Sequence, residues 1–251
     1  MKKQRLSADS NNYSYLCRAF GFNMGANMWK HLIIVMISAL AFADSLAQQS
    51  KTARQMAEQG LVDILTVDST IQVSLMYSRA DNFTGKVLYT DLHEAYLHPK
   101  AATALAKAQK ALRILRPDLS LKVYDATRPM SVQQKMWNTV VGTSKQNYVS
   151  NPRNGGGMHN YGLAVDITLC DAATGDTLDM GTKVDFLGKY AHIDDEAGLV
   201  ARHIITPQAK KNRELLRKVM TDAGFIPLKT EWWHFNLVSR AEAKAHYKAV
   251  Y

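Results

Sequence analysis

Two short runs of the sequence bring metal-binding and acid–base side chains together. His159 and Asp166 stand in a glycine-rich run, and Glu231 precedes His234 in a second run that also holds two tryptophans. Two imidazoles and one carboxylate can hold a catalytic zinc ion and still leave a coordination position for water. Glu231 is near enough to His234 in sequence to serve that water as a base. The two runs therefore predict a metal-dependent hydrolase.

A structural interpretation of the same residues is the alternative. Either histidine could be an ordinary polar residue, and Asp166 could pair with a surface base. The joint pattern, with Gly162 and Trp233 in their places, favours the metal site. The other histidines of the region after residue 47 show no ligand spacing with a partner, and we expect them at the surface or in helices: His93, His98, His192, His203 and His246.

Two strands are predicted to position these side chains. Residues 163–169 alternate, with four apolar residues on one face and Asp166 on the other. His159 lies in the glycine-rich turn that feeds this strand, where backbone freedom lets its ring reach back. His234 lies on a second strand, opposite an apolar face of Trp233, Phe235 and Leu237. Glu231, three residues before His234, would face away on a regular strand, so a bend must bring it to the site.

End residues and apolar spacing predict further helices and strands. Residues 119–125 alternate as a strand does. Helices are predicted over residues 99–115, from a Ser131–Gln134 capping box to Gly142, from Thr206–Pro207 to Gly224, and from Ser239 with Glu242. Because strands and helices do not alternate strictly, we expect an α+β fold. It should be a single domain with a small, largely antiparallel sheet flanked by helices.

The first 47 residues are predicted to be an N-terminal extension with a signal peptide, and residues 48–251 the catalytic domain. Residues 32–43 form an uncharged apolar run after Lys30 and His31, which is short for a membrane span. Small residues permit cleavage after Ala43 or Ala47, and Met28 is an alternative start. A buried helix or an uncleaved anchor are the other interpretations of this run. We expect an exported, periplasmic enzyme without a stable membrane anchor.

Charge and cysteine content narrow the function classes. The chain has 31 basic and 22 acidic residues; removing residues 1–47 takes away 5 and 2, which leaves 26 against 20, a net +6. The basic residues form no stripe with interleaved aromatics, so a nucleic-acid partner is not predicted. Cys170 is then the remaining cysteine, which excludes an intramolecular disulfide and favours a place in the core. Nothing in the pattern specifies an oligomeric state.

Together the motifs resemble the zinc D,D-peptidases that act on peptidoglycan peptides. The motifs that show this resemblance are His-x-x-Gly-x-Ala-x-Asp over residues 159–166 and Glu-x-Trp-His over residues 231–234. Three further runs, residues 77–85, 125–129 and 179–185, are similar to the D-alanyl-D-alanine dipeptidase branch, which includes the dipeptidase of vancomycin resistance. The resemblance covers nearly the whole region from about Val62 to His246.

The resemblance implies a role for each candidate residue. His159, Asp166 and His234 would bind one Zn²⁺ per subunit, and Glu231 would be the catalytic base. Arg128 would stabilise the oxyanion at the scissile carbonyl, unless it only forms a structural salt bridge. Asp185 would bind the free ammonium group of a dipeptide substrate, unless it only caps a helix. The sequence departs from the family at Gly157, where serine is usual, which puts strict substrate preference in doubt but leaves the metal ligands complete.

The expected activity is hydrolysis of D-Ala-D-Ala, or a similar D-amino-acid dipeptide, to free amino acids in peptidoglycan metabolism. Two alternatives use the same site. A D,D- or L,D-carboxypeptidase would trim longer wall peptides, and a non-catalytic module would hold peptidoglycan ends. Asp185 discriminates the first from a dipeptidase, because the ammonium anchor that the resemblance implies requires a substrate with a free amine, and the intact Glu231 argues against the second.

Overall fold

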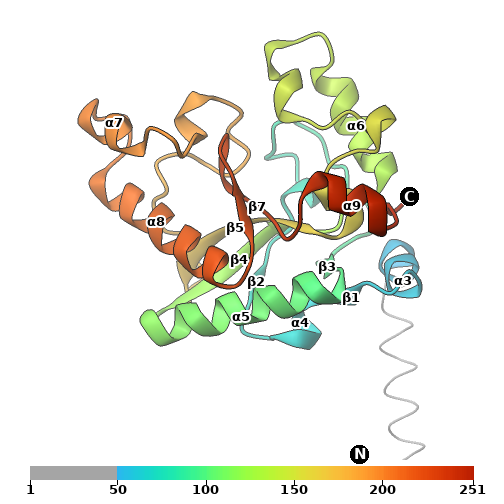
Figure 1. Ribbon diagram of the computed structural model, residues 1–251, viewed down its shortest axis with the longest axis horizontal. Helices are drawn as coiled ribbons and strands as arrows, with labels where there is room; N and C mark the ends of the chain where they lie inside the picture. Colours follow the sequence, from blue (N-terminus) through green and yellow to red (C-terminus); the bar gives the residue numbers. More distant parts are fainter. Residues whose placement is uncertain (1–49) are drawn as a thin grey trace, which may run out of the picture. The chain divides into compact units, whose positions relative to one another are not determined.

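A five-stranded sheet lies at the centre of the computed structural model, which describes residues 50–251 (Figure 1). The strand order is β2-β4-β5-β7-β6, with β2 parallel to β4 and every other pair antiparallel. The α+β prediction with a small, largely antiparallel sheet is confirmed. A separate two-stranded sheet pairs β1 with β3. The strands are β1 (Val62–Asp63), β2 (Gln72–Val73), β3 (Tyr96–Leu97), β4 (Leu119–Asp125), β5 (Ala164–Asp171), β6 (Ile226–Leu228) and β7 (Glu231–Asn236).

Helices surround this sheet (Figure 1). The α-helices are α3 (Lys51–Glu58), α4 (Ile64–Val67), α5 (Pro99–Leu115), α6 (Met130–Val140), α7 (Glu196–Ala201), α8 (Pro207–Asp222) and α9 (Arg240–His246). The 3₁₀ helices are η1 (Met76–Ser78), η2 (Ser144–Tyr148), η3 (Pro152–Asn154), η4 (Met158–Tyr161) and η5 (Lys189–Ala191). The predicted signal peptide and the extension over residues 1–47 lie outside the described residues. Within residues 50–251, no helix is both long and apolar enough to span a bilayer.

The main core lies between the apolar face of the sheet and the long helices α5 and α8. Val123 of β4 and Ile167 of β5 are fully buried there, together with Leu105 of α5 and Leu216 of α8. Burial of these aliphatic side chains stabilises the fold by about 25 cal/mol for each Å² of apolar surface removed from water. Cys170 is buried too, as predicted. The opposite sheet face is thereby left to carry the polar residues of β5 and β7.

Most predicted helix ends are confirmed, and one is wrong. Thr206 caps α8 and Ser239 caps α9, each by accepting a hydrogen bond from a backbone N–H in the first turn. The capping box at Ser131 and Gln134 does not form, because the cap lies two residues earlier, at Pro129, and α6 begins at Met130. The N–H of Met130 instead donates to the carbonyl of Val250, near the end of the chain. A tertiary contact therefore replaces the local cap.

Two irregularities in strand pairing shape the polar face. Val123 pairs with Ile167, but Asp125 pairs with Asp166, so Tyr124 is an extra residue in β4. This bulge moves Asp125 from the apolar face, which it would share with Val123, to the face of Asp166. The second irregularity lies between β6 and β7 and concerns the residues around Glu231.

The second irregularity supplies the bend that Glu231 requires. Pro227 pairs with Phe235, yet the next residue, Leu228, pairs with Glu231 instead of the His234 of a regular ladder. The shift of three residues, from 234 to 231, is odd, and an odd shift exchanges the faces of a strand. His234 itself pairs with Asp166 across β5 and β7. Glu231 and His234 can therefore serve the same site.

Candidate active site

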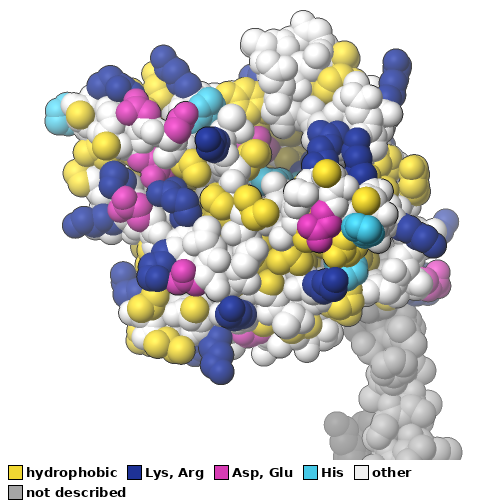
Figure 2. All heavy atoms as spheres, in the orientation of Figure 1, with side chains coloured by type: hydrophobic (Ala, Val, Ile, Leu, Met, Phe, Trp, Pro, Cys, Tyr) yellow, Lys and Arg dark blue, Asp and Glu magenta, His cyan; other side chains and the backbone are white. Residues whose placement is uncertain are grey.

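One cavity of about 390 Å³ contains all six residues singled out from the sequence. Figure 2 looks onto a face where histidine and acidic side chains lie recessed between the part of the chain with α7 and α8 and the part with α6. These six residues, which line the cavity together with others, are Arg128, His159, Asp166, Asp185, Glu231 and His234. Strands β5 and β7 form the floor, and the loops after β4 and before β5 form the walls.

Three of these side chains converge as a metal-ligand set. One potential ligand atom from each of His159, Asp166 and His234 lies within 4.8 Å of the others, and all three residues are buried. Asp166 Oδ1 is 3.3 Å from His159 Nε2 and 3.0 Å from His234 Nδ1. The two ring nitrogens are 3.2 Å apart. Glu231 is outside this convergent group, which fits a role other than ligand.

The hydrogen bonds of the two rings leave lone pairs facing one another. His159 Nδ1 lies 2.7 Å from the carbonyl of Ala126, which can only accept, so this nitrogen carries the proton. His234 Nε2 lies 2.8 Å from Asn236 Oδ1, and it likewise donates. The nitrogens aimed at Asp166 are thus bare, and a cation between them and the carboxylate satisfies all three groups. The donor set fits a zinc ion.

Protons compete with a cation for this set. Burial lowers the pKa of His159, but the carboxylates of Asp166 and Asp125 together raise that pKa above its ordinary value. Burial alone would raise the pKa of Asp166, yet the imidazoles of His159 and His234 hold it well below its usual range. The Asp166 carboxylate therefore favours positive charge at this place, whether a proton or a metal cation carries it.

The turn that carries His159 is fixed by close packing. His159 lies in η4, which ends at Gly162 with a φ of +66°. A Cβ there would come within 2.9 Å of both the His98 backbone N and Thr127 Oγ1, so a side chain is excluded by conformation and by space. The His159 carbonyl also accepts a hydrogen bond from the Arg128 N–H at 3.0 Å. The metal-ligand turn and the arginine loop are thereby joined.

Arg128 is held by a buried carboxylate. Its Nε and one terminal nitrogen donate to Asp125 Oδ2 at 3.0 and 2.5 Å, and the other terminal nitrogen donates to Gln133 Oε1 at 2.9 Å. Tyr89 OH donates to the second Asp125 oxygen at 2.6 Å. The guanidinium lies 3.8 Å from Asp166 Oδ2, so it borders the metal-ligand set. Arg128 is thus both a buried ion-pair partner and a fixed charge at the cavity.

Asp185 lines the cavity and is held there by two hydrogen bonds. Its oxygens accept hydrogen bonds from Tyr77 OH at 3.0 Å and from the Phe83 N–H at 2.9 Å. These contacts hold it at a φ of +70°, which L-residues rarely adopt but aspartate tolerates better than most. It does not cap a helix, since Gly188 precedes η5, the next helix along the chain. Burial raises the pKa of Asp185 to about 6, and the Phe83 N–H opposes this.

Glu231 is the second carboxyl group with a raised pKa. It begins β7 and is buried in the same cavity as His234. Burial raises the pKa of Glu231 to about 7, with His234 acting in the opposite direction. A carboxyl group that titrates near neutral pH can take and return a proton during one reaction cycle.

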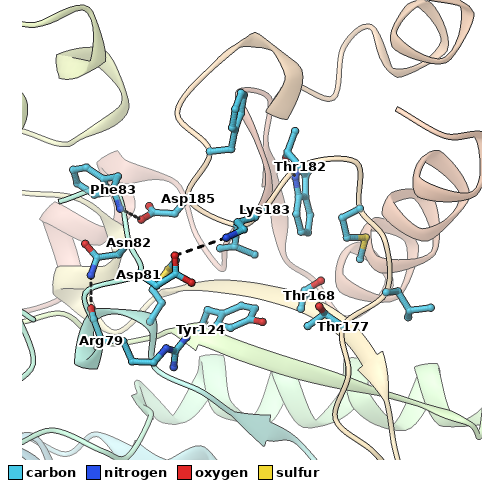
Figure 3. Close-up of a pocket in the computed structure, with 16 residues that line it drawn as sticks. Arg79, Asp81, Asn82, Phe83, Tyr124, Thr168, Thr177, Thr182, Lys183 and Asp185 are labelled. Carbon is cyan, nitrogen blue, oxygen red and sulfur yellow. Dashed lines mark hydrogen bonds and ion pairs between the residues drawn. The ribbon is translucent and has the colours of Figure 1, made fainter. Parts of the chain in front are cut away.

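A second cavity, of about 420 Å³, lies next to the first (Figure 3). Phe83 and Asp185 line both cavities, and Figure 3 shows the hydrogen bond that joins them. Thr168 and Trp232 line the second cavity, so Trp232 is a wall of that cavity rather than of the histidine site. Asp185 and Phe83 are thus shared by the two cavities.

Several residues of the site carry no signal in the sequence that assigns them a role. Asp125, Tyr77 and Gln133 contact Arg128 or Asp185 directly. Asp125 and Tyr77 stand within the runs that carry the family resemblance, which was the one available signal. The other histidines of residues 50–251 are outside the convergent group; His98, for example, caps α5 through its ring.

Comparison with known proteins agrees with this geometry. A family model described as Peptidase_M15, D-Ala-D-Ala dipeptidase, matches residues 57–250. The chain belongs to this peptidase family. M15 peptidases are metallopeptidases, so the chain is a metallopeptidase, and the His-Asp-His set is its candidate metal site.

Curated D-alanyl-D-alanine dipeptidases also match the chain. A D-alanyl-D-alanine dipeptidase of Escherichia coli is 35% identical over 72% of this chain and 86% of its own length. One of Streptomyces coelicolor is 29% identical over 67% of this chain and 87% of its own length. One of Enterococcus faecalis is 28% identical over 64% and 83%. The chain therefore spans most of each relative.

Proposed function

We propose that this M15 peptidase is a zinc-dependent dipeptidase that hydrolyses D-Ala-D-Ala or a similar D-amino-acid dipeptide. The observation that carries the proposal is the cavity in which Asp185, Arg128, Glu231 and the three potential metal ligands lie together. The names of the relatives support the choice of substrate. We further propose export through a signal peptide within residues 1–47, periplasmic location and a role in peptidoglycan metabolism.

His159, Asp166 and His234 would hold one zinc ion per subunit. When bound, it would polarise the scissile carbonyl and acidify the attacking water. Glu231, whose pKa burial raises to about 7, takes the proton from that water and delivers it to the leaving amine. Arg128 faces the carbonyl oxygen as negative charge develops on it, and Asp125 prevents the guanidinium from turning away.

Asp185 makes the site suited to a dipeptide. Its carboxylate, fixed by Tyr77 and the Phe83 N–H, offers an anionic partner to a free ammonium group. A substrate extended or acylated at its N-terminus brings no charge to this carboxylate and meets the wall that Asp185 forms with Phe83. A carboxypeptidase acting on longer peptides would need that wall to open.

Hydrolysis of D-Ala-D-Ala beside its N-acetyl derivative tests the proposed function. We expect turnover of the free dipeptide, loss of turnover on chelation and recovery with added zinc. Asp185→Ala should reduce the difference in kcat/KM between the free and the acetylated dipeptide, because the group that binds the free amine is gone. Preference of the unaltered protein for the acetylated substrate would instead identify a carboxypeptidase, and no hydrolysis of either would identify a binding module.

The pH dependence of kcat/KM follows from two carboxyl groups. Glu231 must be deprotonated to act as a base and Asp185 to bind an ammonium group, and burial raises their pKa values to about 7 and about 6. Activity should therefore fall as the pH decreases through 7 and more steeply below 6. Metal content measured at each pH separates this effect from loss of the cation. A kcat/KM that is constant between pH 8 and 5 would contradict both assignments.

A further inference from the structure

The place of the side chain that Gly157 lacks is filled by a residue from another loop. A Cβ built at Gly157 would stand 2.9 Å from Ser150 Oγ and 3.2 Å from Ser150 Cβ. The φ of Gly157 is −109°, which any residue adopts, so the backbone does not require glycine here. Ser150 is therefore the obstacle to a side chain at position 157. Both residues line the active-site cavity.

The hydroxyl group of Ser150 is available to a ligand. Ser150 uses its backbone carbonyl to accept a hydrogen bond from Gln133 Nε2 at 2.7 Å, whereas its Oγ has no hydrogen-bond partner among residues 50–251. The side chain is half-buried. A hydroxyl group at the wall of a cavity, with its donor and acceptor capacity unused by the protein, is suited to binding a polar group of the substrate.

The site residues lie in a chain of contacts with Arg128 in the middle. On one side, the guanidinium carbon lies 5.2 Å from the ring centre of Tyr77, whose OH donates to Asp185. On the other side, Arg128 donates to Gln133, which in turn donates to Ser150. The order Asp185, Arg128, Ser150 matches the order of ammonium group, scissile carbonyl and carboxylate along a dipeptide. Ser150 then lies at the carboxylate end.

The charge of the cavity supports this direction. Arg240 also lines the cavity and donates to the carbonyl of Gly156 at 2.9 Å, next to Gly157. The acidic Asp185 and the basic Arg240 thus both line the cavity, and Arg240 contacts the residue next to Gly157. A zwitterionic substrate is oriented by such a pair of opposite charges.

We propose that Ser150 Oγ donates a hydrogen bond to the C-terminal carboxylate of the substrate, from the space that a side chain at position 157 would occupy. The inference rests on the proposed dipeptidase function. Ser150 is then a specificity-determining residue supplied by the loop between η2 and η3, and the glycine at 157 is a consequence of its presence.

Three variants and two substrates test this role. Ser150→Ala should raise KM for D-Ala-D-Ala about 10-fold with kcat nearly unchanged, since a hydrogen bond to a charged group is lost. The C-terminal amide of the same dipeptide should show no such rise. Gly157→Ser should impair binding and lower the unfolding temperature, because its Cβ meets Ser150. The double variant Ser150→Ala/Gly157→Ser should regain most of both losses.

The controls separate the possible failures. Ser131→Ala makes the same chemical change at an exposed position of α6 and should leave KM unchanged. If the unaltered protein hydrolyses the dipeptide and Ser150→Ala has the same KM, the role of Ser150 is refuted while the proposed function stands. A double variant that is more impaired than either single variant would refute that role as well. A lack of turnover by the unaltered protein would refute the proposed function and this inference with it.

Discussion

Replacing Glu231 with glutamine should lower kcat about 10²- to 10⁴-fold while zinc binding is retained. The amide keeps the size of the carboxyl group but cannot take a proton from water. Zinc binding should persist because Glu231 is not among the three converging groups. Steady-state kinetics on D-Ala-D-Ala, with the metal content of the same preparation determined by mass spectrometry, measure both quantities.

Glu214→Gln provides a matched control for this variant. Glu214 lies exposed on α8, where it pairs with Lys210 of the same helix. Its replacement should leave both kcat and metal content as they are. Turnover by Glu231→Gln at a rate close to that of the unaltered protein would show that another group acts as the base. Loss of zinc in that variant would make Glu231 a ligand instead.

Asp125→Ala should be the most destabilising of these substitutions, by about 3–5 kcal/mol. The change leaves the buried guanidinium of Arg128 without its carboxylate partner and Tyr89 OH without its acceptor. Arg128 should also lose its fixed orientation at the cavity, so kcat should fall in the fraction that folds. Chemical denaturation and kinetics at low temperature measure the two effects.

The control for this prediction is an aspartate–arginine pair on the surface. Asp118 and Arg116 are both about half exposed and form an ion pair at 2.5 Å, so Asp118→Ala should change stability little. Asp125→Asn gives a further comparison, because it removes the charge but preserves the shape. Equal effects of Asp118→Ala and Asp125→Ala on the free energy of unfolding would contradict the structural role of Asp125.

Local patterns predicted the secondary structure around the site well where their causes were local. The strand over residues 163–169 and the cap at Thr206 depend on neighbouring side chains and backbone groups, and both were confirmed. The capping box at Ser131 does not form because α6 begins at Met130, and the N–H of that residue donates to the carbonyl of Val250, far along the chain. Residues 1–47 and their signal peptide stay predictions.

The sequence by itself determined which side chains are available for chemistry in this protein. His159, Asp166, His234 and Glu231 show the type and spacing of a metal hydrolase site within two short runs, because ligand identity is a property of residue type. The resemblance to the dipeptidases added Arg128 and Asp185 as candidates, and the match of the family model over residues 57–250 confirmed the family.

Only the tertiary structure decided how these groups are held. Tyr77 contacts Asp185 across 108 residues, and Asp125 reaches the polar face only through the bulge at Tyr124. Ser150 fills the space beside Gly157 from a separate loop. Such contacts depend on strand register and loop packing, which many distant residues set together, so no local pattern encodes them.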